Sequence, residues 1–106
     1  MKLIELTIED NGKTFKVNPG QMAILRLKEN PTTGYLWKVL DKHGLELESK
    51  FNPSPDAMIG GGGTREFKIR FMDEGEYVMK LKHWCSWEKE KSNIELFSVN
   101  FRVTTA

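Results

Sequence analysis

Apolar residues in this chain recur mostly at every second position, and this spacing constrains the fold more than any other feature. Near the C-terminus, for example, Phe97, Val99, Phe101 and Val103 alternate with polar residues. Because successive side chains of a β-strand point to opposite faces, such a segment forms a strand with one apolar face and one polar face. The spacing of three or four residues that marks an amphipathic helix is hard to find. The pattern therefore predicts an all-β protein.

Turn signals rich in Gly, Pro and Asn divide the chain into short strands. We place seven or eight strands, near residues 2–9, 13–17, 22–28, 35–41, 46–51, 64–71, 76–83 and 94–104. The pair Asn11-Gly12 is the strongest local signal for a hairpin. Many short antiparallel strands without helical segments between them are typical of an immunoglobulin-like β-sandwich, and an open barrel is the alternative.

The length and composition fit one domain. The chain has 106 residues, of which 39% are hydrophobic and 29% are charged. A chain of this length buries roughly two-thirds of the surface that its unfolded form exposes, so a self-sufficient core is expected. No internal repeat or linker divides the sequence. We therefore assign residues 1–106 to a single domain and expect a monomer.

Charge and hydropathy patterns exclude several classes of partner. The 16 Lys and Arg residues are interspersed with 15 Asp and Glu residues, for a formal net charge of +1. This gives no basic patch for nucleic acid or an anionic membrane, and no segment approaches the roughly 20 apolar residues of a membrane-spanning helix. The N-terminus lacks the continuous apolar segment of a secretory signal. We expect no nucleic-acid or membrane partner and a cytoplasmic location for the chain as given, although a processed vesicular or secreted form would have the same sequence.

Cys85 is the only cysteine, which excludes an intrachain disulfide and a four-cysteine zinc site. His83 lies two residues before it, a spacing that could suggest a thiol nucleophile with its base. No third orienting residue and no oxyanion-hole signature accompany them. We therefore interpret the pair as a structural histidine beside a half-buried thiol, and we expect no catalytic residue, metal or cofactor.

Three segments between predicted strands could contact a partner. The first reads Asn30-Pro31-Thr32-Thr33-Gly34-Tyr35. Pro31 fixes its own φ and favours an extended Asn30, while Gly34 permits a positive φ before the next strand. The loop should therefore be short and stiff, with two threonine hydroxyl groups at its tip, although an ordinary turn would have the same composition.

The second segment is Gly60-Gly61-Gly62-Gly63-Thr64. Successive glycines are costly to order, but they allow another backbone to approach closely. A flexible linker is the alternative, yet a strand pattern resumes directly at Phe67. The segment also lacks the Lys-Ser or Lys-Thr ending of a phosphate-binding P-loop.

The third segment is Trp84-Cys85-Ser86-Trp87, which lies between the last two predicted strands. An exposed tryptophan is a common anchor of protein interfaces, although both rings could instead cover the end of the sandwich. Alternation from Met79 and Leu81 places residue 83 on the inner face and Trp87 beyond the strand, in the loop.

Together the three segments resemble the chagasin family of cysteine peptidase inhibitors, whose members have an Asn-Pro-Thr-Thr-Gly-aromatic loop, a Gly-x-Gly-Gly loop and an Arg-Pro-Trp loop in this order. The first motif is complete here, and Gly60, Gly62 and Gly63 fit the second. The third agrees only at Trp87, because cysteine and serine replace the arginine and the proline. This departure removes a charged contact and a rigid residue from the third loop.

The resemblance implies an immunoglobulin-like sandwich whose three loops form a wedge at one end and fill the active-site cleft of a papain-like cysteine peptidase. Thr32 would then lie over the peptidase's catalytic centre, Gly62 and Gly63 would let backbone hydrogen bonds form along the cleft, and Trp87 would stack on an aromatic wall. The implied function is tight, reversible, competitive inhibition without chemistry of its own. The alternative from another class is an immunoglobulin-like module that binds a protein or a carbohydrate through aromatic residues, namely Tyr35, Trp37, Trp84 and Trp87.

Overall fold

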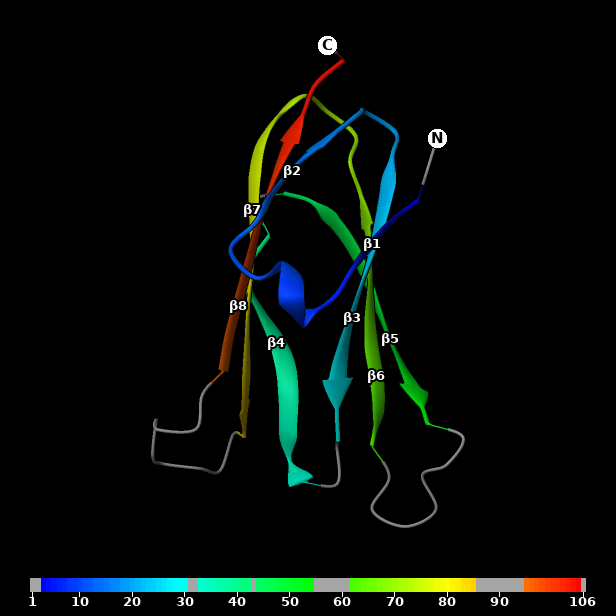
Figure 1. The fold of residues 1–106 in the computed structure, drawn as a ribbon, viewed down its shortest axis with the longest axis vertical. Helices are drawn as coiled ribbons and strands as arrows, with labels where there is room; N and C mark the ends of the chain where they lie inside the picture. Colours follow the sequence, from blue (N-terminus) through cyan, green and yellow to red (C-terminus); the bar gives the residue numbers. More distant parts are fainter. Residues whose placement is uncertain (1–2, 31–32, 43, 55–61, 86–94, 106) are drawn as a thin grey trace.

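The computed structural model describes residues 3–30, 33–42, 44–54, 62–85 and 95–105. Two four-stranded sheets pack face to face, with their strands along the long axis of the molecule (Figure 1). The strands are β1 (Ile4–Leu6), β2 (Thr14–Val17), β3 (Met22–Glu29), β4 (Tyr35–Asp41), β5 (Glu46–Pro53), β6 (Gly63–Arg70), β7 (Gly75–Cys85) and β8 (Glu95–Val103). The predicted immunoglobulin-like β-sandwich is confirmed.

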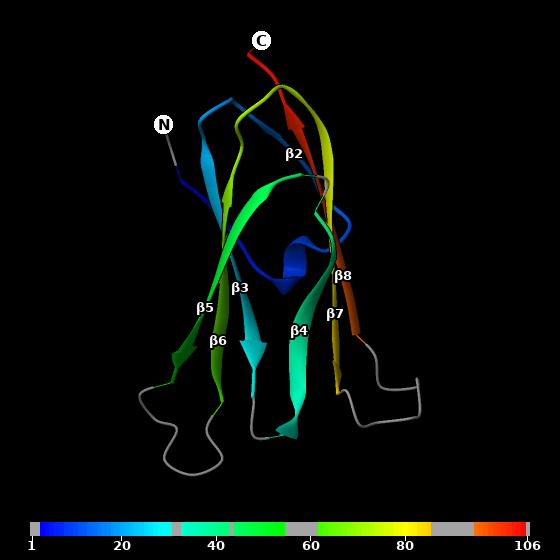
Figure 2. The same ribbon diagram turned by 180° about the vertical axis from the view of Figure 1, so that it is seen from behind.

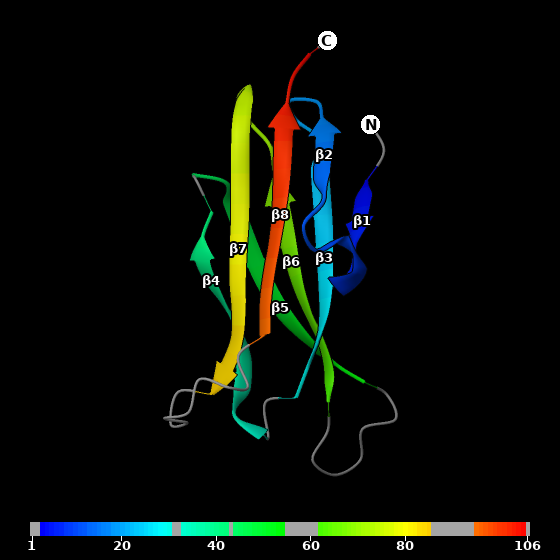
Figure 3. The ribbon, with the colours of Figure 1, turned by 60° about the vertical axis from the view of Figure 1, so that its left-hand side comes forward.

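The strand orders are β1-β3-β6-β5 in the first sheet and β2-β8-β7-β4 in the second, and the two layers are visible from behind and from the side (Figures 2 and 3). Most neighbours are antiparallel, but β1 pairs with β3 in parallel, and β2 pairs with β8 in parallel. The prediction of antiparallel strands is therefore wrong at these two edges. The chain passes from one sheet to the other between β1 and β2, so each of these short strands joins a different sheet.

The segment after β1 also differs from the prediction. The strand expected over residues 2–9 ends at Leu6, and a short 3₁₀ helix, η1 (Ile8–Asp10), follows. Thr7 caps η1, because its side-chain oxygen accepts a backbone N–H of the first turn at 3.3 Å and its own N–H donates to the Asp10 carboxylate at 2.9 Å. The part of the chain that the structure describes contains no helix long and apolar enough to cross a membrane.

The hairpin predicted at Asn11-Gly12 is wrong. These two residues turn the chain onto β8: the Gly12 N–H donates to the Ser98 carbonyl at 2.7 Å, and the Asn11 side-chain oxygen accepts the Ser98 N–H at 2.8 Å. Gly12 has the positive φ of 84° that its turn signal implies. The local signal predicts the turn but not its partner, because pairing with distant strands decides where β1 and β2 lie.

The core consists of the inward-facing residues of both sheets. Met79 and Leu81 of β7 are fully buried, as their alternation predicts. The ring centroid of Phe101 lies 4.7 Å from that of Phe71 and 6.2 Å from that of Phe15. Full burial of one large apolar side chain contributes roughly 1.5–3 kcal/mol. Packing of this core is therefore the main source of stability.

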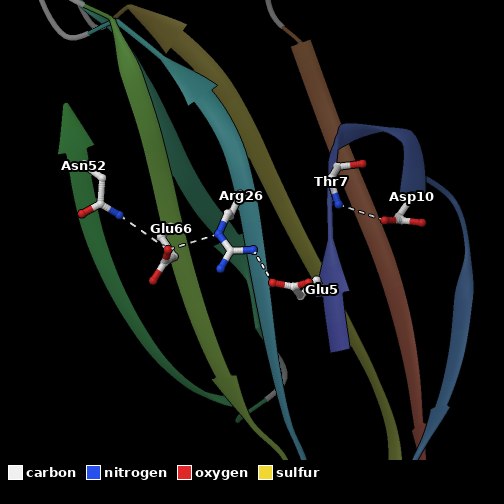
Figure 4. A network of polar contacts seen from close by, with 6 residues as sticks. All are labelled: Glu5, Thr7, Asp10, Arg26, Asn52 and Glu66. Atoms are coloured by element: carbon white, nitrogen blue, oxygen red, sulfur yellow. Dashed lines mark hydrogen bonds and ion pairs between the residues drawn. The ribbon is translucent and has the colours of Figure 1, made fainter. Parts of the chain in front are cut away.

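A polar network on the first sheet ties its strands together (Figure 4). Arg26 of β3 donates to Glu5 of β1 at 2.8 Å and to Glu66 of β6 at 3.3 Å, and Asn52 of β5 donates to Glu66 at 3.5 Å. The hydrogen bonds to Glu5 and then to Glu66 raise the pKa of Arg26 above its ordinary value. Because these groups are partly exposed, each ion pair contributes at most about 1 kcal/mol to stability.

Asn11→Ala should lower the free energy of unfolding by about 1 kcal/mol, because the Ser98 N–H loses its side-chain acceptor. Asn11→Asp keeps an acceptor oxygen and should lower it less. Urea unfolding followed by tryptophan fluorescence measures both. An Asn11→Ala variant as stable as the wild type would mean that the bond to β8 contributes nothing.

Candidate functional site

The three motif segments connect strands whose ends meet at one end of the sandwich. β3, β5 and β7 end there, and β4, β6 and β8 begin there (Figures 1 and 2). Gly63, the first residue of β6, lies opposite Glu29 on one side and Pro53 on the other, and Asn30 forms a bridge with Tyr35. The flanks of the three segments therefore converge, as expected from the order of strands in such a sandwich.

The structure describes part of the predicted contact set. The described members are Asn30, Thr33, Gly34, Tyr35, Gly62, Gly63, Thr64, Trp84 and Cys85. The members that lie outside the described residues are Pro31, Thr32, Gly60, Gly61, Ser86 and Trp87. Contact of the whole set with a peptidase stays a prediction.

The described residues of the first segment form hydrogen bonds with one another. The Thr33 N–H donates to the Asn30 carbonyl at 3.1 Å, and the Thr33 hydroxyl donates to the same oxygen at 2.7 Å. The Thr33 hydroxyl oxygen also accepts the Tyr35 N–H at 3.3 Å. Gly34 is buried with a φ of 82°, which confirms the positive φ predicted for it. These contacts hold the two flanks of the loop in a fixed turn.

A buried carboxylate at the end of β3 links the first two segments. The Glu29 side chain has no exposed surface. One of its oxygens accepts the Trp37 N–H at 2.7 Å, and the other accepts two N–H groups of Arg65, from Nε at 3.0 Å and from Nη2 at 2.8 Å. Trp37 lies just after the first segment and Arg65 just after the second. The Glu29 carboxylate therefore clamps both segments to the same point.

Glu29 is a residue that the sequence-based reasoning missed. Glu29 directly precedes the first motif but belongs to none of the three segments. One signal could have identified it: Leu25 and Leu27 occupy the inward positions of β3, and alternation places Glu29 on the same inner face. A carboxylate on an apolar face requires a buried partner, and Arg65 provides it.

An aromatic stack fills the interior beneath the segments. The Trp37 ring lies parallel to the His83 ring at 4.7 Å between centroids, and the Tyr35 ring meets His83 edge-on at 5.7 Å. The Trp37 indole N–H donates to the Lys28 carbonyl at 2.9 Å. Trp37 is only 8% exposed, so it does not belong to a surface that could bind a carbohydrate. This finding weakens the alternative of an aromatic binding module.

Cys85 is buried at the end of β7, where it lies opposite Tyr35. The thiol is therefore more deeply buried than the half-buried position expected for it. His83 Nδ1 lies 3.5 Å from the Glu95 carboxylate, and its Nε2 has no hydrogen-bond partner among the described residues. Among all the described residues, no three His, Cys, Asp or Glu side chains are placed to hold a metal ion.

The two described glycines of the second segment have different surroundings. A Cβ atom on Gly63 would collide with the backbone of β5, at the Asn52 carbonyl and at 2.8 Å from the Pro53 Cα. A Cβ atom on Gly62 would lie 3.7 Å from its nearest neighbour, the Glu29 carbonyl. Gly63 is therefore required for strand packing, whereas Gly62 has room for a side chain.

A recess of about 480 Å³ lies between the flanks of the first two segments. Its walls include Asn30, Thr33, Gly62 and His83. The short polar side chains of Ser54 and Thr64 also line it. Short side chains of this kind lose little conformational entropy when they form a hydrogen bond.

The fold and its loop end define the class of protein: a small immunoglobulin-like β-sandwich with three strand connections gathered at one end. The sequence profile described as "Chagasin family peptidase inhibitor I42" matches residues 16–101. The chain therefore belongs to the chagasin family of cysteine peptidase inhibitors, which are not enzymes.

Known relatives agree with this assignment. Chagasin of Trypanosoma cruzi is 26% identical over an alignment of 106 positions, which covers 93% of this chain and 96% of the relative. The solution structure of amebosin is 27% identical and superposes with a TM-score of 0.81, covering 98% of this chain and 100% of amebosin. PbICP-C, solved in complex with falcipain-2, shares the fold at 17% identity with a TM-score of 0.65, covering 98% of this chain and 100% of PbICP-C.

Glu29→Ala should lower the free energy of unfolding by about 3 kcal/mol, because it leaves the Arg65 guanidinium and the Trp37 N–H without their acceptor. Glu29→Gln keeps an acceptor oxygen but not the charge, so its loss should be intermediate. Urea unfolding measures both variants. A loss below about 1 kcal/mol for Glu29→Ala would contradict the clamp.

Gly63→Ala should lower the free energy of unfolding by about 2 kcal/mol, because the added methyl group must displace the backbone of β5. Gly62→Ala is the matched control and should stay within about 1 kcal/mol of the wild type. Thermal and urea unfolding distinguish the two. Equal losses would mean that β5 moves aside without cost.

Proposed function

We propose that this protein inhibits papain-like cysteine peptidases by tight, reversible, competitive binding, with its three loops filling the active-site cleft. The observation that carries the proposal is the convergence of the loop flanks at one end, with the first two clamped by the Glu29 carboxylate. The complex of PbICP-C with falcipain-2 supports this class of partner. We further propose that the protein acts as a monomer, without a cofactor and without a nucleic-acid or membrane partner.

The roles of the loops follow from their chemistry. Thr32, which directly follows the rigid Pro31, is the central residue over the peptidase's catalytic cysteine. The glycine segment approaches the cleft closely enough for backbone hydrogen bonds, and Trp87 packs on a cleft wall. Because the flanks are already fixed, little conformational entropy is lost on binding, and most of the contact energy is retained as affinity.

Inhibition should need no chemistry from the inhibitor. The Cys85 thiol is buried, so position 85 contributes through the backbone of the third loop rather than through its sulfur. Cys85→Ser should inhibit as the wild type does, and the inhibitor should be recovered uncleaved, as mass spectrometry can show. A mixed disulfide with the peptidase, or loss of inhibition by Cys85→Ser, would contradict noncovalent occlusion.

The three loops should differ in importance. We expect Thr32→Arg to weaken inhibition most, because a bulky charge meets the catalytic centre. Trp87→Ala should be intermediate, with a loss of about 2 kcal/mol, roughly thirtyfold in affinity. Gly62→Glu should have the smallest effect, since Gly62 has room for a side chain in the free protein.

Inhibition constants against one papain-like peptidase test this ranking, with melting temperatures measured alongside. Thr14→Arg, at an exposed position of β2, is the matched control for Thr32→Arg and should change neither quantity. Serine and metallopeptidases should not be inhibited. An unchanged constant for Thr32→Arg would remove the first loop from the mechanism, and no inhibition of any papain-like peptidase at micromolar inhibitor would refute the proposed function.

A further inference from the structure

The outer face of the second sheet has a basic and apolar surface next to the loop end. Two rows of residues form it. In the row nearest the loops, Leu36 of β4 lies opposite Trp84 of β7. In the next row, Lys38 of β4 lies opposite Lys82 of β7, which in turn lies opposite Leu96 of β8. We call these five residues the basic face.

The two lysines of the basic face share one aromatic ring. The Lys82 ammonium lies 4.3 Å from the centre of the Trp84 ring, and that of Lys38 lies 5.8 Å from it. Like charges directly opposite each other destabilise a sheet, and cation–π attraction to the shared ring counteracts this cost. Such an arrangement favours a partner that brings negative charge.

No acidic side chain of the described residues neutralises this pair. Neither Lys38 nor Lys82 forms an ion pair with any described residue. The nearest carboxylate along β8, that of Glu95, lies against His83. The nearest along β4, that of Asp41, lies in register with Lys80, beyond the lysine row. Among the described residues, the positive charge of these two lysines is therefore uncompensated close to the loops.

A further property fits a protein contact. Leu36 is 44% exposed and Leu96 is 62% exposed, so apolar side chains border the lysines. An apolar margin around charged groups suits a partner surface with carboxylates beside apolar groups.

Resting on the proposed function, we propose that the basic face is a second contact surface for the inhibited peptidase, and that it takes acidic side chains on the rim of the cleft. Leu36 directly follows the first loop, and Trp84 leads into the third. Because a strand rises about 3.3 Å per residue, the lysine row lies about 7 Å behind the row nearest the loops. Once the loops occupy the cleft, this row borders the cleft rim. The basic face then selects peptidases whose rim is acidic and accelerates association with them.

Lys38→Glu tests the basic face without endangering the fold. It places a glutamate opposite Lys82, so the melting temperature should stay unchanged or rise. The inhibition constant against a papain-like peptidase with an acidic rim should weaken about tenfold at low salt, mainly through slower association, and the difference should shrink at high salt. Against a peptidase with a basic rim, Lys38→Glu should inhibit as well as the wild type or better.

Lys16→Glu is the matched control, because it makes the same charge change at an exposed position of β2 in the same sheet, away from the basic face. The inhibition constant of Lys16→Glu should differ from that of the wild type by less than about twofold. Equal effects of Lys38→Glu and Lys16→Glu, or a loss that is the same for acidic and basic rims, would overturn the inference while leaving the proposed function intact. A wild-type protein that inhibits neither peptidase would overturn both.

Discussion

The carboxylate of Glu29 is the contact on which the loop end depends. Burying a charge without partners is unfavourable by several kcal/mol, so the surrounding groups must be placed to satisfy it. Here one oxygen accepts the N–H of Trp37 and the other accepts two N–H groups of Arg65. Because these partners follow two different loops, satisfying one carboxylate fixes the relative positions of both loops.

The arrangement around this clamp suits an inhibitor that must not rearrange on binding. The first loop is closed by the Thr33 hydroxyl and by the buried turn at Gly34, and the stacked rings of Trp37 and His83 support it from inside. Gly63 packs too closely against β5 for any side chain. Flanks fixed in this way lose little conformational entropy when a partner binds.

Much of the architecture could be predicted from local patterns. Alternation located all eight strands, and motif order identified the family. Two local expectations are wrong: Asn11-Gly12 forms a turn but no hairpin, and the Cys85 thiol is fully buried and not half-buried. In both cases the outcome depends on which distant strand lies alongside, β8 for the turn and β4 for the cysteine. A local sequence window contains neither neighbour.

By itself, the sequence determined the strand periodicity, the positive φ of Gly34 and the membership of the chagasin family, because each is carried by short motifs of neighbouring residues. Only the tertiary structure decided the parallel edges of the two sheets, the pairing of Glu29 with Arg65 across 36 positions, and the meeting of Lys38 with Lys82 beside Trp84. These contacts arise where strands from distant parts of the chain lie side by side. Their register is set by packing of the whole core, which local propensities do not specify.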